Sequence, residues 1–233
     1  MKTGELRSAR ALIVASSIAA VLLFGATGSA SAGTLDQQQT SFGAFSSGGV
    51  NSTQSLAQTF TAGVTGRLDQ ADLVMSTFSS PTAPVTIEIR DAAGGLPGNT
   101  MLASTSIPIS AIPADPNPAF VSATFGSPAA VVSGTQYALV AWSTNAAGSP
   151  GWSYLLSTNP YPAGRAMNSQ ASPPGNDWNG PDGDDFAFKT YVVPSPPEPA
   201  PVPHAKKCKK HKKKHKRAAV AKKKCKKKKK HRH

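Results

Sequence analysis

A loop in the later part of the chain brings four aspartates together. The segment 176–185 reads NDWNGPDGDD and carries Asp177, Asp182, Asp184 and Asp185. Calcium takes six to eight oxygen ligands from carboxylates and backbone carbonyls, which a loop of this composition can supply. If calcium binds, we expect Asp182, Asp184 and Asp185 to be its ligands. The spacing does not fit an EF-hand, and the alternative is an ordinary acidic Gly/Pro loop without metal.

Aromatic residues suggest a second kind of site. Trp152 and Tyr154 share one face of an expected strand, and Trp178 lies within the acidic loop. Flat aromatic rings bury a large area at low entropic cost and suit the faces of sugar rings. We therefore predict a ligand platform at Trp152, Tyr154 and Trp178. The alternative is core packing, which we expect for Trp142 and Tyr137.

Acid–base or nucleophilic catalysis is hard to build from residues 33–193. This segment has no histidine and no cysteine, so a Ser–His or Cys–His pair is unavailable. A pair of carboxylates could still act on a glycoside. The candidates are Glu88, Asp91, Asp177, Asp182, Asp184 and Asp185. Strand and turn positions favour solvated, non-catalytic carboxylates, so we predict no catalytic residue and no enzymatic activity.

The last thirty residues form a strongly basic tail. Residues 204–233 contain sixteen lysines, two arginines and no acidic residue. Low-complexity lysine cannot form a hydrophobic core, so we predict a disordered tail that binds polyanions. The predicted binding residues are Lys206, Lys207, Lys209, Lys210, Lys212, Lys213, Lys214, Lys216, Arg217, Lys222, Lys223, Lys224, Lys226, Lys227, Lys228, Lys229, Lys230 and Arg232.

The tail also holds both cysteines and all five histidines of the chain. In an exported protein, we expect a disulfide between Cys208 and Cys225. The alternative is a zinc or copper site that uses these thiols with His211 and His215. Its spacing matches no standard zinc finger, and the surrounding positive charge opposes a dication.

Composition divides the chain into five segments. Residues 1–32 have a basic start, an apolar run and an Ala-Ser-Ala end, as in a cleaved secretory signal peptide. We expect a flexible polar segment at 33–54, a folded domain at 55–193 and a Pro-rich linker at 194–203, before the tail at 204–233. Residues 33–193 carry four basic and ten acidic side chains, a net charge of −6, whereas the tail carries +18. The +13 of the whole chain therefore belongs to the tail.

The folded domain has the pattern of an all-β protein. Val85, Ile87 and Ile89 alternate with polar residues, as expected for a strand with one buried face and one solvated face. Nine or ten such short segments, separated by Gly/Pro turns, predict an antiparallel β-sandwich. The strand number favours a jelly-roll arrangement.

The order of several short motifs in this domain resembles a known family. The motifs are Gln58-Thr-Phe-Thr61, Gly66-x-Leu68, Val85-Thr-Ile87, Gly95-x-Pro97-Gly98, Gly134-Thr-x-Tyr137, Trp178 and Asp185-x-Ala-Phe188-Lys-Thr-Tyr191. Together they resemble exported bacterial modules of the "choice-of-anchor" kind, over roughly Ser55 to Val193. The resemblance implies a jelly-roll-like sandwich, a surface location and a binding or structural role. It implies no catalytic residues. The lysine tail stands where that family often has a sorting signal.

These features predict an exported, surface-associated and non-enzymatic module that its tail holds on anionic envelope polymers. The expected partners are those polymers, a glycan, and nucleic acid only non-specifically. We expect no cofactor apart from the calcium considered above, and no membrane span after cleavage of the signal peptide. The alternatives are a secreted carbohydrate-binding or glycan-acting protein and an extracellular polyanion binder.

Overall fold

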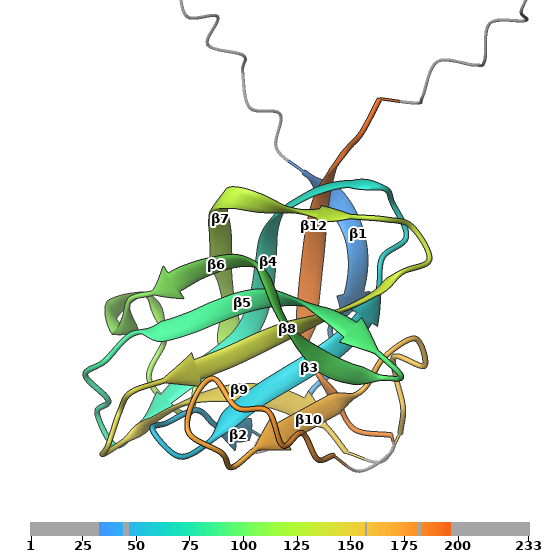
Figure 1. Cartoon of the computed structure of the whole chain (residues 1–233). Coiled ribbons are helices and arrows are strands. Elements are labelled where there is room, and N and C mark those ends of the chain that lie inside the picture. The colour runs from blue at the N-terminus through green and yellow to red at the C-terminus, as the bar shows by residue number, and fades with distance from the viewer. Residues whose placement is uncertain (1–32, 44–46, 157, 181–182, 197–233) are drawn as a thin grey trace, which may run out of the picture. The chain divides into compact units, whose positions relative to one another are not determined.

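The computed structural model describes residues 33–43, 47–156, 158–180 and 183–196, and these residues form an antiparallel β-sandwich (Figure 1). The predicted fold class is confirmed. The strands are β1 (Thr34–Gln39), β2 (Ser47–Gly49), β3 (Ser55–Thr61), β4 (Gly66–Phe78), β5 (Val85–Ala93), β6 (Leu96–Ile107), β7 (Ala119–Val131), β8 (Gln136–Ser143), β9 (Ser149–Leu155), β10 (Ala166–Ser169), β11 (Asp185–Phe186) and β12 (Phe188–Pro194). A short 3-10 helix, η1 (Ile109–Ala111), joins β6 to β7. No helix in the described ranges is long and apolar enough to cross a membrane.

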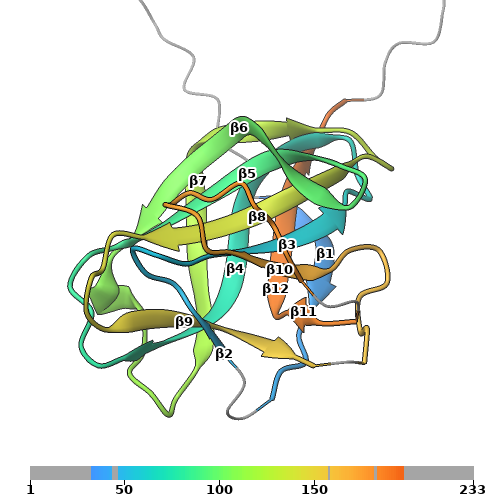
Figure 2. The ribbon, with the colours of Figure 1, turned by 60° about the horizontal axis from the view of Figure 1, so that its bottom comes forward.

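The chain folds like one long hairpin that wraps into two layers. Four antiparallel pairs are nested in the sequence: β1 with β12, β3 with β8, β4 with β7, and β5 with β6. They assemble into one sheet of order β1-β12-β4-β7 and a second sheet of order β3-β8-β5-β6, and the two sheets lie face to face (Figures 1 and 2). This arrangement of eight strands is a jelly roll, as the strand number predicted.

The tip of this long hairpin is a two-residue turn. Ala93 pairs with Leu96, and Gly94 and Gly95 between them have φ angles of +62° and +80°. Two consecutive positive φ angles are what a two-residue hairpin turn matched to the strand twist requires, and glycine adopts them without steric cost. The Gly-Gly pair therefore fixes the register of β5 against β6.

The core lies between the inner faces of the two sheets. Ile87 and Ile89 of β5 point into it, together with Phe60 of β3 and Phe188 of β12. These side chains are fully buried, and burial of each stabilises the fold by roughly 1.5–3 kcal/mol. The apolar positions of β5 therefore face the core, as the period-two pattern predicted.

Four further strands extend the jelly roll at one end. β9, β10 and β11 come from the long connection between β8 and β12, and β2 pairs with β9. β9 continues the first sheet, where its residues Ser149–Trp152 pair with the end of β4. β10 pairs with β3 and becomes the edge of the second sheet. The connection between β8 and β12, residues 144–187, thus contributes strands to both sheets.

Two predicted boundaries need correction. The segment 33–54, expected to be a flexible start, contributes β1 and β2 to the first sheet. β1 is fixed by its pairing with β12, which no local sequence signal announces. The linker was expected to begin at Pro194, but Pro194 pairs with Gly66 at the end of β12, and Ser195 N donates to Thr65 O at 3.0 Å. The remaining linker, from residue 197, and the tail at 204–233 lie outside the described residues.

Candidate binding site on the outer face of the second sheet

A buried ion pair lies on the face of the second sheet that points away from the core. Because side chains alternate along β5, Ile87 and Ile89 enter the core while Glu88 and Arg90 take the opposite face. Sequence reasoning expected this opposite face to be solvated. Instead, Glu88 and Arg90 are each only 5% exposed. A second layer of chain must therefore cover them.

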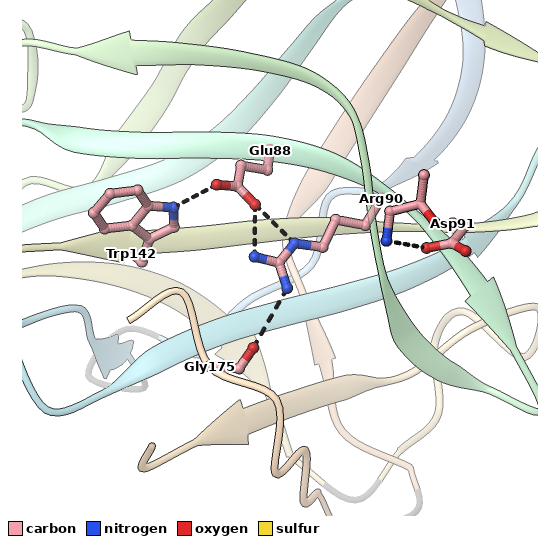
Figure 3. A network of polar contacts seen from close by, with 6 residues as sticks. Glu88, Arg90, Asp91, Trp142 and Gly175 are labelled. Atoms are coloured by element: carbon pink, nitrogen blue, oxygen red, sulfur yellow. Dashed lines mark hydrogen bonds and ion pairs between the residues drawn. The ribbon is translucent and has the colours of Figure 1, made fainter. Parts of the chain in front are cut away.

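The ion pair and an indole form a connected polar network (Figure 3). Arg90 donates from Nε to Glu88 Oε2 at 2.7 Å, and its Nη2 lies 2.7 Å from the same oxygen. Glu88 Oε1 accepts a hydrogen bond of 2.9 Å from Trp142 Nε1 of the neighbouring strand β8. Trp142, which we expected in the core, is therefore half-buried on the outer face. The buried charges neutralise each other, and both carboxylate oxygens have donors.

The covering layer is the loop of residues 170–180, which follows β10. Arg90 Nη1 donates to Gly175 O at 3.4 Å, so the ion pair also anchors the loop (Figure 3). Gly175 has φ +74°, and a Cβ at this position would lie 2.6 Å from Ser169 Cβ. Only glycine fits this conformation and this close approach. Trp178 of the loop packs on a small apolar cluster made of Ala57, Ala138, Val140 and Met167.

Polar contacts hold both ends of the loop. Asn168 and Asn179 exchange backbone hydrogen bonds of 2.7 and 2.8 Å, which close the loop at its base. Asp177 Oδ1 accepts hydrogen bonds from Ser169 Oγ and from Ala171 N. These donors, that of Ser169 first, lower the pKa of the exposed Asp177 carboxyl. The loop is thus fixed to the sheet before any ligand arrives.

A groove runs between this loop and the β5–β6 hairpin. Its volume is about 390 Å³, and it is lined by Arg90, Asn99, Ala171, Ser172, Pro174, Gly175 and Asn176. Arg90 forms the floor, whereas Asn99, Ser172 and Asn176 are exposed on the walls. The hairpin wall is held by Asp91, whose Oδ1 accepts a hydrogen bond of 2.9 Å from Thr100 N (Figure 3). We regard this groove as the candidate binding site.

Of the three aspartates of the predicted calcium site, the structure describes Asp184 and Asp185. Asp182 lies outside the described residues. The carboxylate of Asp185 is buried and accepts 2.8 Å and 3.0 Å hydrogen bonds from Gln58 Nε2 and Tyr161 N. Burial raises the pKa of this carboxyl, although the bond from Gln58 opposes the shift. Asp185 therefore ties the connection after β9 to β3. No three His, Cys, Asp or Glu side chains in the described part form a metal-binding group.

The predicted aromatic platform is wrong for Trp152. This indole is fully buried, stacks on Phe186 with ring centroids 4.5 Å apart, and donates from Nε1 to Ala187 O at 2.9 Å. Tyr154 contacts the edge of Phe186 and is half-buried. Trp178 belongs to the outer face of the other sheet. The shared strand face of Trp152 and Tyr154 points inward because β9 continues the first sheet.

A smaller cavity of about 130 Å³ lies at the open edge between the sheets. Tyr154 and Asp184 line it, together with Leu56, Met167 and Phe186. The structure thus brings one residue of the predicted platform and one of the predicted calcium ligands to the same cavity. All predicted residues of the tail, including Cys208 and Cys225, lie outside the described residues.

Most carboxylates named as catalytic candidates have structural partners. Glu88 is paired with Arg90, Asp91 holds the hairpin, Asp177 caps the loop and Asp185 is part of the core network. Sequence reasoning missed the outer-face network as a site. One signal could have indicated it: opposite charges at Glu88 and Arg90, two residues apart on the polar face of one strand.

Comparison with known proteins adds no assignment. No protein-family model matches the chain, and no curated protein is significantly similar to it. The resemblance to choice-of-anchor modules therefore stays a prediction from the order of motifs.

Proposed function

We propose that this protein is an exported, non-enzymatic binding module, held at the cell envelope by its basic tail. The observation that carries the proposal is the separation of charge along the chain. The folded segment 33–193 has a net charge of −6, and residues 204–233 carry +18 without one acidic residue. The folded domain has the charge of an ordinary soluble module, and the tail has the charge of a polyanion ligand.

The tail has enough charge to act as an anchor. A basic residue close to an anionic surface contributes up to about 1 kcal/mol. A third of that value over eighteen charges gives about 6 kcal/mol, which corresponds to a dissociation constant of some tens of micromolar. Such binding is firm at a surface with many anionic groups, and salt weakens it because the contacts are screened. Nucleic acid would bind in the same non-specific way.

The arrangement of the domain's carboxylates supports a non-enzymatic role. Glu88 and Asp185, two of the buried members of the candidate set, accept hydrogen bonds from Arg90, Trp142, Gln58 and the backbone. Carboxylates held by such donors position the segments around them, whereas a general acid or base needs free access to its substrate. The preorganised groove between the loop and the hairpin suits binding.

Sedimentation with isolated envelope fragments tests the proposal. The full chain is compared with a variant of equal length in which all sixteen tail lysines are glutamine. We expect the full chain to sediment with the fragments in 0.1 M NaCl and to be released by 1 M NaCl, and the glutamine variant to stay in solution. Equal sedimentation of both proteins would overturn the role of the tail.

A further inference from the structure

We propose that the groove between the 170–180 loop and the β5–β6 hairpin binds an uncharged, polyhydroxylated ligand, namely a segment of a neutral glycan. The inference rests on the proposed function in one respect, because it names the ligand class of the binding module. Its evidence is independent of the tail, and lies in the donors, acceptors and charges of the groove itself.

The charge balance of the groove favours an uncharged ligand. Among the described residues that line it, Arg90 is the one charged side chain. Its charge is balanced by Glu88 at 2.7 Å, and both side chains are nearly fully buried. A carboxylate or phosphate ligand would have to compete with Glu88 for the guanidinium. The positive charge of the guanidinium would repel an ammonium ligand. The floor of the groove therefore offers hydrogen bonds without net charge.

Arg90 keeps donors for a ligand. Its guanidinium has five N–H groups, and the contacts to Glu88 and Gly175 use three of them. The remaining two belong to a side chain that lines the groove and is held rigidly from two sides. A rigid donor loses little entropy when a ligand oxygen binds, so it contributes to affinity more than a mobile surface group does.

The walls offer both donors and acceptors. Asn99 and Asn176 lie on opposite sides of the groove, and each amide can donate and accept. Ser172 adds a hydroxyl group, which also acts in both ways. Adjacent hydroxyl groups of a sugar likewise donate and accept, so this lining matches them. Pro174 and Ala171 supply the apolar surface against which the C–H groups of a sugar ring can pack.

The size and fixation of the groove fit such a ligand. A volume of about 390 Å³ is within the range of small-molecule sites, which is roughly 300–1,000 Å³. The loop wall is closed at its base by Asn168 and Asn179, and the hairpin wall by Asp91. Both walls are therefore in place before binding, as a specific polar site requires.

Isothermal titration calorimetry with the full chain tests this inference. The probes are chitohexaose, cellohexaose and maltohexaose, which are neutral, and hexagalacturonate, which is anionic. All titrations are made in 0.5 M NaCl, which screens the tail. We expect at least one neutral probe to bind, and the Asn99→Ala and Asn176→Ala variants to weaken it by roughly 2- to 10-fold each, as loss of one hydrogen bond predicts.

The matched control is Asn117→Ala, at an exposed asparagine in the loop before β7. It should leave the affinity unchanged. Circular dichroism of all variants checks that each is folded. Absence of binding by all three neutral probes, or equal affinity of the Asn99, Asn176 and Asn117 variants, would overturn the inference. If hexagalacturonate bound more tightly than the neutral probes, and the same substitutions weakened it, the claim that the ligand is uncharged would be overturned. None of these results would affect sedimentation of the full chain with envelope fragments, so the two proposals fail separately.

Discussion

Removal of Glu88 should destabilise the domain far more than an average substitution does. In Glu88→Met, Arg90 stays buried on the outer face and loses the carboxylate 2.7 Å away, and Trp142 Nε1 loses its acceptor. Breaking one side of a buried ion pair costs about 3–5 kcal/mol, because the remaining charge is uncompensated. For a domain of this size, each kcal/mol lowers Tm by roughly 2–4 °C. We therefore expect Tm to fall by about 6–20 °C.

The double variant Glu88→Met, Arg90→Met distinguishes the buried pair from ordinary packing. Replacement of both charges by apolar groups of similar volume is often neutral or stabilising. The double variant should therefore be more stable than either single variant. Ser104→Ala is the control, since Ser104 pairs with Glu88 across β5 and β6 and is exposed. Ser104→Ala should change the free energy of unfolding by no more than about 0.5 kcal/mol.

Urea unfolding followed by far-UV circular dichroism gives the free energies of unfolding for this cycle. If the losses of the two single variants simply add in the double variant, Glu88 and Arg90 are not coupled. If Glu88→Met lowered the free energy of unfolding by less than about 1 kcal/mol, water would have to reach Glu88 and Arg90. Either result would refute the view that the 170–180 loop seals the outer face.

Two further substitutions test the fixed loop and the buried carboxyl. Gly175→Ala should lower the free energy of unfolding by about 1–3 kcal/mol, as measured by urea unfolding, because residue 175 has φ +74° and its Cβ would meet Ser169. The control is Gly126→Ala, where an added Cβ would lie in open space and should have little effect. Burial raises the pKa of Asp185, so the folded protein holds the proton of this carboxyl more tightly than the unfolded chain does. The stability of the protein therefore falls as pH rises from about 4 through the raised pKa. The stability of Asp185→Asn relative to the natural protein should therefore improve between pH 4 and pH 7, and a constant difference would contradict the shift.

Local patterns were sufficient to predict the fold class. Alternation of Val85, Ile87 and Ile89 with polar residues identified β5. The Gly- and Pro-containing residues 91–98 indicated a long turn after it, which the structure confines to Gly94 and Gly95. Such signals concern residues within one strand or turn, where the backbone geometry imposes the period. The need to bury one face of each strand then leads to two packed sheets.

The features that the sequence could not give depend on pairing between distant segments. β1 is held by β12, about 150 residues away, so a polar stretch that looked flexible became part of a sheet. Trp142 and Trp152 both lie on expected strands, but only the pairing of these strands decides that Trp152 enters the core and Trp142 faces outward. The groove likewise depends on how the 170–180 loop folds back over Arg90.

Location of the protein in the cells that produce it tests the central claim most directly. The cells are washed with buffer that contains between 0.1 and 1 M NaCl, and the protein is quantified in the wash, on the cells and in the medium. Electrostatic retention predicts that the natural chain stays on the cells at 0.1 M NaCl and leaves them as salt rises, while the glutamine-tail variant is found in the medium throughout. Retention of the glutamine-tail variant on the cells at 0.1 M NaCl would contradict the account.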